Sequence, residues 1–299
     1  MISSISSSLA WRGLLLTIAG ATLISFETLL LRLVQADLWT VIWWRGVLLG
    51  TTMLIGLVPR RSFRALLLRG WSERLAVIGF AAAISCFVAA IQNTTVANTL
   101  VIGSAAPFMA TILSWTLLRE RQRALTWITV LVLVAGLAII FHDSLRLNHL
   151  LGDAFALGYA ACLGAYFVAL RRARADAFAA IIGYGGLLSA LIASPFAAPL
   201  TLSSDSFLFI LLLGVLVVPL ATLLLAKGTQ HLAAPDVTLI MMLETILGPL
   251  WVWMALGELP DGATFAGGAL IIATVVAHAY AAARRPAATN PQLGTSATR

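Results

Sequence analysis

The sequence predicts an all-α membrane protein of ten transmembrane helices, arranged as two inverted five-helix repeats. Hydrophobic residues make up 61% of the chain, charged residues only 10%, and the mean hydropathy is +0.98. Soluble domains carry about 25% charged residues. Ten long apolar segments predict the ten helices, and an internal repeat predicts the two halves.

The positive charge of the chain is explained by a membrane and not by nucleic acid. The net charge is +7 and the isoelectric point about 10.4. Most basic residues lie in short segments between apolar runs, as they do in the cytoplasmic loops of membrane proteins. We therefore expect the lipid bilayer as a partner, and no nucleic acid.

Ten apolar segments are each close to the roughly 20 residues that a spanning helix needs. They are Leu14–Val34, Trp39–Leu57, Leu75–Val96, Leu100–Leu118, Leu125–Phe141, Asp153–Leu170, Ala177–Ala198, Phe207–Ala226, Val237–Leu256 and Ala263–Ala282. We call them spans 1 to 10. The remaining segments are short, and the two ends, rich in small and polar residues, are expected to be disordered.

The distribution of arginine predicts the orientation in the membrane. Segments such as "PRRSFRALLLRGWSER", "RERQR" and "RRARAD" would lie on one side, whereas the segments on the other side hold one arginine between them, Arg146. By the positive-inside rule both termini are cytoplasmic, in a bacterial-type inner (plasma) membrane.

The two halves of the chain repeat each other. A shift of 139 residues superimposes Leu31-Arg32 on Leu170-Arg171, and a shift of 138 superimposes Glu120 on Glu258. "RERQR" after span 4 is basic, but its counterpart "GELPDGA" after span 9 is not. Equivalent loops thus have opposite charge bias, as an inverted repeat requires, and such repeats are typical of secondary transporters with a substrate site at the repeat interface.

The repeat divides the chain into five parts. They are a cytoplasmic tail at 1–12, the first five-helix repeat at 13–141, an external linker at 142–151, the second, inverted repeat at 152–283 and a cytoplasmic tail at 284–299.

Two stretches carry a family resemblance. "PFMATILSWTLLRE" at Pro107–Glu120 and "LETILGPLWVWMALGE" at Leu243–Glu258 resemble the pattern of the drug/metabolite transporter superfamily, in its ten-helix branch of two EamA-type domains. The second stretch departs from the pattern because Thr245 replaces the expected proline. The resemblance implies export of amino acids or other small metabolites, with the aromatic amino-acid exporter as the nearest analogue.

Ionisable residues inside spans are functional candidates by default. Glu27 and Arg45 both lie roughly 10 Å from the outer membrane surface, at 1.5 Å rise per residue, on helices joined by a short turn. We expect them to form a pair, which either fixes the first hairpin or contacts a substrate carboxylate through Arg45. Arg32, nearer the helix end, is expected to extend toward the membrane surface.

Glu244 is a lone carboxylate in an apolar run, and its repeat counterpart is Ala106. Since the symmetry of the scaffold does not require an acid there, Glu244 is the leading candidate for contact with substrate or proton. A structural hydrogen bond to a neighbouring helix is the alternative. Helical spacing places it on one stripe with Gly248 and Trp251.

Other polar and aromatic residues are weaker candidates for substrate contact, since each could equally pack or bond between helices. They are Tyr159, Tyr166, Gln92, Asn93 and Trp251. Proline frees a backbone carbonyl and permits a bend, so the hinge candidates are Pro107, Pro219, Pro249 and the adjacent Gly248.

The favoured function is a secondary transporter that exports amino acids or related metabolites by alternating access around a central cavity between the repeats. Nucleosides and cationic compounds are alternative substrates, and a passive channel or a membrane enzyme using His149 and Asp153 is a different class. No nucleotide-binding motif is present. We expect no catalytic residues, no cofactor and no metal, and a monomer suffices for a pathway.

Overall fold

The computed structural model describes residues 2–57, 66–119, 124–147, 149–228 and 234–283. The α-helices are α1 (Ile2–Leu33), α2 (Leu38–Ile55), α4 (Trp71–Asn93), α5 (Val96–Gly103), α6 (Ala106–Leu118), α7 (Ala124–Leu147), α8 (Leu150–Leu170), α9 (Phe178–Ala193), α10 (Ser204–Leu211), α11 (Val218–Gly228), α12 (Ala234–Leu256) and α13 (Gly262–Ala283). A π-helical segment, η4 (Leu212–Val217), joins α10 to α11. Short 3₁₀ turns, η2 (Ala175–Ala177) and η3 (Pro199–Thr201), flank α9.

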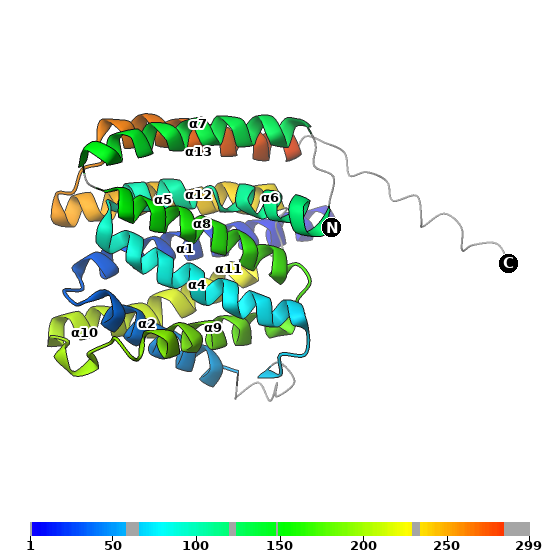
Figure 1. The fold of residues 1–299 in the computed structure, drawn as a ribbon. Coiled ribbons are helices and arrows are strands. Elements are labelled where there is room, and N and C mark those ends of the chain that lie inside the picture. The colour runs from blue at the N-terminus through cyan, green and yellow to red at the C-terminus, as the bar shows by residue number, and fades with distance from the viewer. Residues whose placement is uncertain (1, 58–65, 120–123, 148, 229–233, 284–299) are drawn as a thin grey trace.

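The described chain contains helices long and apolar enough to cross a membrane, which confirms the all-α membrane class. Six are full-length candidates and four more are shorter apolar helices. These ten segments correspond to the ten predicted spans. The helices lie roughly side by side in Figure 1, and the first turn of α1 and the last of α13 lie at the same end of the bundle, as an even number of spans requires.

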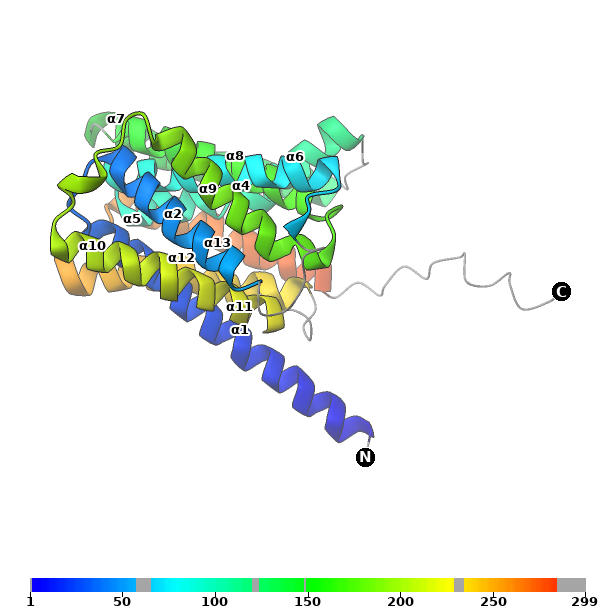
Figure 2. The same cartoon turned by 90° about the horizontal axis from the view of Figure 1, so that it is seen from below.

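The two halves interdigitate instead of packing as separate bodies. α4 packs on α8 while its repeat counterpart α11 packs on α1, and α6 packs on α8 while α12 packs on α1. Two helices pack on their own counterparts, α2 on α9 and α7 on α13 (Figures 1 and 2). Each contact therefore has a mate in the other half, which is the arrangement that an inverted repeat produces.

Glycine allows the closest of these contacts, between α2 and α9. A Cβ on Gly46 would lie 2.5 Å from the Gly186 carbonyl oxygen, and one on Gly50 would lie 2.8 Å from that of Gly183. No side chain fits at such distances, so the two backbones approach directly. Small residues at i and i+4 are the usual means of close helix packing in membranes.

Side-chain caps fix several helix ends. Asp37 accepts a hydrogen bond from the Thr40 amide at 2.9 Å and begins α2, and Asp261 accepts one from the Thr264 amide at 2.6 Å and begins α13. Such caps satisfy amides that have no partner inside the helix. They hold the connections at this end of the bundle in place.

The opposite end is closed by an ion pair. Glu73, buried in the first turn of α4, accepts a hydrogen bond from Arg174 Nε at 2.8 Å, and Arg174 also donates to the Leu67 carbonyl. The hydrogen bond from Arg174 to Glu73 raises the pKa of that arginine. The pair joins α4 to the segment between α8 and α9.

The structure places helix in two segments that were predicted to lie outside the membrane spans. α1 begins at Ile2, so most of the predicted tail at 1–12 continues the first helix, and Figure 2 shows its N-terminal turns projecting from the bundle. The linker predicted at 142–151 is mostly helical, because α7 extends to Leu147 and α8 begins at Leu150. The predicted tail at 284–299 lies outside the described residues.

The hinge prolines occupy three different backbone settings. Pro107 follows a break at Ser104 and Ala105 that divides span 4 into α5 and α6. Pro219 follows the π-helical segment η4, which absorbs the hydrogen bond that proline cannot make. Pro249 lies inside a continuous α12. The α-helix is thus interrupted near Pro107 and Pro219 but not at Pro249.

Candidate functional site

The predicted pair of Glu27 and Arg45 is present inside the bundle. Arg45 Nη2 donates to Glu27 Oε1, and the two residues are 4% and 5% exposed, respectively. Helices α1 and α2 are consecutive and joined by four residues, so charged groups at similar depths meet. A buried ion pair is costly to desolvate and needs further hydrogen bonds to offset that cost.

Arg45 lacks those further bonds within the described chain. Its Nε and Nη1 are buried and have no hydrogen-bond partner among the described residues. Its guanidinium lies 6.0 Å from the centroid of the Phe87 ring. Buried donors are almost always paired in folded proteins, so these two nitrogens leave hydrogen-bonding capacity that the described residues do not use.

Tyr159 and Glu244 bring two more polar groups to the same region. The Tyr159 ring packs on Phe87 with centroids 4.9 Å apart. Its hydroxyl lies within electrostatic range of the carboxylates of Glu244 and Glu27 and of Arg45. Four residues from α1, α2, α8 and α12, and so from both repeats, therefore form one group, which we call the charged cluster.

Glu244 is half-buried and differs from Glu27 in having no counterion. The described residues offer its carboxylate no hydrogen bond or salt bridge, and it lies close enough to Glu27 for the two acids to interact. A carboxylate at membrane depth without a cation is costly. The structural hydrogen bond considered as an alternative is not found among these residues.

The stripe of Glu244, Gly248 and Trp251 faces the interior of the bundle. A Cβ on Gly248 would lie 3.1 Å from Thr28 Oγ1 of α1, and Trp251 Nε1 donates to Ser25 Oγ of α1 at 2.9 Å. Trp251 also stacks on Phe26, with centroids 4.8 Å apart. Since these contacts are with α1, Glu244 lies on the side of α12 that faces the bundle. The Trp251 indole is already bonded to α1 and so has a structural role.

The structure separates Tyr166, Gln92 and Asn93 from the charged cluster. Tyr166 is buried in another core group and packs on Phe80. Gln92 donates to the Ala36 carbonyl at 3.2 Å, and Asn93 donates to the Ala89 carbonyl of its own helix at 2.8 Å. The repeat places Tyr166 at the position equivalent to Glu27, but equivalent positions of an inverted repeat need not be neighbours.

Arg32 and Glu258 form an ion pair that was not predicted. Arg32 Nε donates to Glu258 Oε2 at 2.8 Å and Arg32 Nη1 donates to the Ile91 carbonyl, while Glu258 Oε1 accepts from the Val96 amide at 3.0 Å. Arg32 lies in the last turn of α1 and is partly exposed, and a carboxylate from the other repeat reaches it there. Glu258 is the last residue of the span-9 motif, which is the sequence signal that could have singled it out.

A buried polar network ties four segments together at the same end. Asp153 accepts hydrogen bonds from Thr94 Oγ1 at 2.6 Å and from Asn98 Nδ2 at 3.1 Å, and Thr264 donates to Asn98 Oδ1. Asp153 is 0% exposed. This arrangement gives Asp153 a structural role and weakens the enzyme alternative that paired it with His149.

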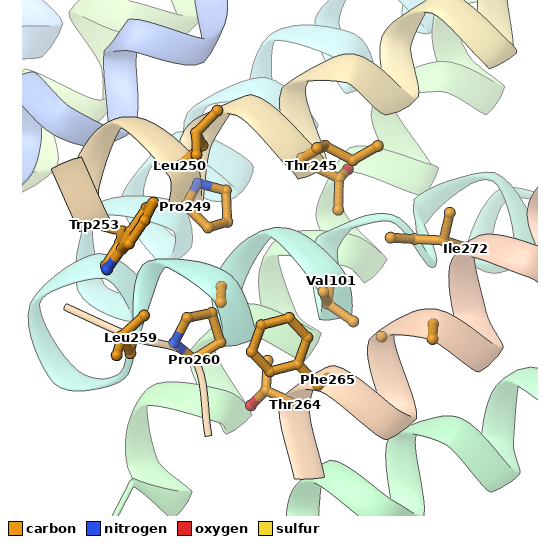
Figure 3. A pocket seen from close by; sticks show the side chains of 14 residues that line it. Val101, Thr245, Pro249, Leu250, Trp253, Leu259, Pro260, Thr264, Phe265 and Ile272 are labelled. Carbon is orange, nitrogen blue, oxygen red and sulfur yellow. The ribbon is translucent and has the colours of Figure 1, made fainter. Parts of the chain in front are cut away.

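Two cavities lie away from the charged cluster. The larger, about 500 Å³, is an apolar groove between α5, α12 and α13, where Pro249, Trp253 and Phe265 line its walls (Figure 3). The smaller, about 360 Å³, lies at the junction of α1 and α4, beside Arg32. Neither is lined by Glu27, Arg45 or Glu244.

Comparison with known proteins assigns the family. The model of the EamA-like transporter family matches residues 11–142 and again residues 150–279. Pseudopaline exporter CntI of Pseudomonas aeruginosa, from strains UCBPP-PA14 and PAO1, is 28% identical over 242 residues, which cover 76% of this chain and 81% of that protein. A solved crystal structure shares the fold with a TM-score of 0.60 at 18% identity, covering 95% of this chain and 99% of the other. Two family matches, one in each half, span most of the sequence, and the chain therefore belongs to the EamA-like transporter family.

Proposed function

We propose that the protein is a secondary transporter of the inner membrane that exports amino acids or related small metabolites. Family membership favours transport over an enzyme activity, and a relative is named as an exporter of pseudopaline, a small molecule. The observation that carries the proposal is the charged cluster, which both repeats build at membrane depth and which neither repeat has alone.

Arg45 is proposed to bind the substrate carboxylate. Its Nε and Nη1 are donors without a described partner, and a carboxylate can accept a charge-assisted hydrogen bond from one of them. Glu27 holds the remaining nitrogen, Nη2, and fixes the orientation of the group. A carboxylate here would accept a hydrogen bond that the described residues do not.

Glu244 is proposed to bind the substrate ammonium. It is the acid of the cluster without a described cation, and an ammonium group would balance its charge. A molecule with one carboxylate and one ammonium offers a partner to Arg45 and another to Glu244, and the Tyr159 hydroxyl lies within electrostatic range of both residues. The chemistry of the cluster thus fits a zwitterion better than a simple anion or cation.

Transport by alternating access is proposed from the symmetry of the fold. The helices of one half pack on those of the other, so small rotations of one half expose the cluster to either side. The basic segments "RERQR" and "RRARAD" support cytoplasmic termini, and with them an inner-membrane location.

Purified protein in proteoliposomes tests the proposal. A panel of labelled amino acids, a nucleoside and a monovalent organic cation is loaded, and efflux is followed with and without a pH gradient. Efflux of one or more amino acids that falls in the Arg45→Gln variant supports the proposal. Flux of the nucleoside or the cation alone, with no amino-acid flux, contradicts it. If the pH gradient changes no efflux rate, transport is not coupled to protons.

A further inference from the structure

The smaller cavity begins one helical turn beyond Glu27, because Leu31 of α1 lines it. It is lined by Arg32, Gln35 and Gln92 together with apolar residues, and it is open to the surface at the end of the bundle where α1 and α4 end. Gln35 is exposed on its rim. Polar groups therefore surround an open cavity beside the end of α1, the helix that carries Glu27.

Apolar side chains separate this cavity from the cluster. Leu31, Val34 and Ile91 line the cavity, and they are only 3%, 7% and 1% exposed. Leu31 lies one helical turn from Glu27, so the two side chains share a face of α1. On α1, a layer only one side chain thick therefore separates the cavity from the Glu27–Arg45 ion pair.

The Arg32–Glu258 ion pair holds this layer in place. Arg32 follows Leu31 directly, and through Glu258 it ties α1 to the end of α12 and to the first amide of α5. Its second bond, to the Ile91 carbonyl, ties α1 to α4 as well. One pair thus joins four helices, two of which carry the apolar layer.

We propose that the cavity is the vestibule through which substrate leaves the charged cluster, and that the Arg32–Glu258 pair is the latch that keeps it closed. The inference rests on the proposed function for the identity of the cargo. When the pair separates, α1 is released from α4, α5 and α12, and the apolar layer opens. The pair is 28% and 20% exposed, so it can exchange its bonds with water at small cost.

A cysteine in the apolar layer measures opening without any substrate. In a background with Cys86→Ala and Cys162→Ala, Leu31→Cys is labelled by a charged methanethiosulfonate reagent in nanodiscs, where both faces are accessible. Adding Glu258→Gln keeps an oxygen that can accept from the Val96 amide but removes the charge that Arg32 binds. We expect labelling to accelerate about three- to fivefold, the factor that loss of a partly exposed ion pair gives.

Matched variants separate release of the latch from general loosening. Gln35→Cys, on the open rim, should be labelled at one rate with and without Glu258→Gln, and Arg32→Gln should accelerate Leu31→Cys as Glu258→Gln does. An unchanged rate at Leu31→Cys in both latch variants overturns the inference, and so does an equal acceleration at both cysteines. Because no cargo is present, these outcomes are independent of whether amino acids are transported.

Discussion

Glu27 and Arg45 form an ion pair between the first two helices, buried to 5% and 4% exposure, and two further nitrogens of that arginine have no partner among the described residues. The pair gives the Glu27 carboxylate a counterion but leaves two of the three Arg45 nitrogens without a hydrogen bond among the described residues. This imbalance distinguishes it from the Glu73–Arg174 pair, in which the arginine also reaches a backbone carbonyl. The first pair is therefore suited to bind a ligand and the second to hold the fold.

Removal of Glu27 should destabilise the protein strongly. Glu27→Ala leaves Arg45 buried without a counterion, and the expected loss of unfolding free energy is about 3–5 kcal/mol. The double variant Glu27→Gln with Arg45→Gln removes both charges and should lose less. Unfolding in mild detergent measures both. A double variant less stable than Glu27→Ala would contradict the account.

Glu244→Gln should abolish or greatly reduce transport without loss of stability. Glutamine keeps the volume but removes the negative charge proposed to bind the substrate ammonium, and no described cation loses a partner. Efflux from proteoliposomes and thermal unfolding are measured on one preparation. A Gln variant with full efflux would return Glu244 to a structural role.

Tyr159→Phe separates the hydroxyl from the ring. The ring packs on Phe87 and would remain, whereas the hydroxyl near Glu244 and Glu27 is lost. One hydrogen bond to a charged group contributes about 1.5–3 kcal/mol, so substrate affinity should fall about ten- to hundredfold with stability unchanged. An unchanged half-saturation concentration for efflux would exclude Tyr159 from the site.

Gly46→Ala should disrupt the contact of α2 with α9. The new Cβ would lie 2.5 Å from the Gly186 carbonyl, and overpacking of this kind costs about 1–3 kcal/mol. Gly262→Ala is the matched control, since a Cβ there meets nothing within 4 Å. Equal melting temperatures for the two variants would show that α2 and α9 do not approach as described.

Apolar length and charge predicted the fold because both can be read directly from consecutive residues. Apolar length gave the ten spans, and the repeated Leu31-Arg32 and Glu258 positions gave the two halves. Helix ends differ from the predicted spans where helices continue beyond their apolar part, as α1 does to Ile2 and α7 to Leu147. Polar residues can continue a helix outside the bilayer, so hydropathy does not mark its end.

The candidate site was predicted where partners are close in sequence and missed where they are distant. Glu27 and Arg45 lie on consecutive helices, so equal depth was enough to pair them. Glu258 meets Arg32 from the other end of the chain, 226 positions away, and depth alone does not select it. Tyr166 was assigned by repeat alignment, which gives equivalent positions and not neighbours.

The central claim is that the charged cluster binds a substrate through one carboxylate and one ammonium. The most direct test compares efflux of an amino acid from the panel with that of its carboxamide, which lacks the carboxylate, and of its deaminated acid, which lacks the amine. The account predicts flux of the amino acid alone in the wild type, with the preference against the carboxamide lost in Arg45→Gln and that against the deaminated acid lost in Glu244→Gln. Equal flux of all three molecules in the wild type, or unchanged selectivity in both variants, would contradict it.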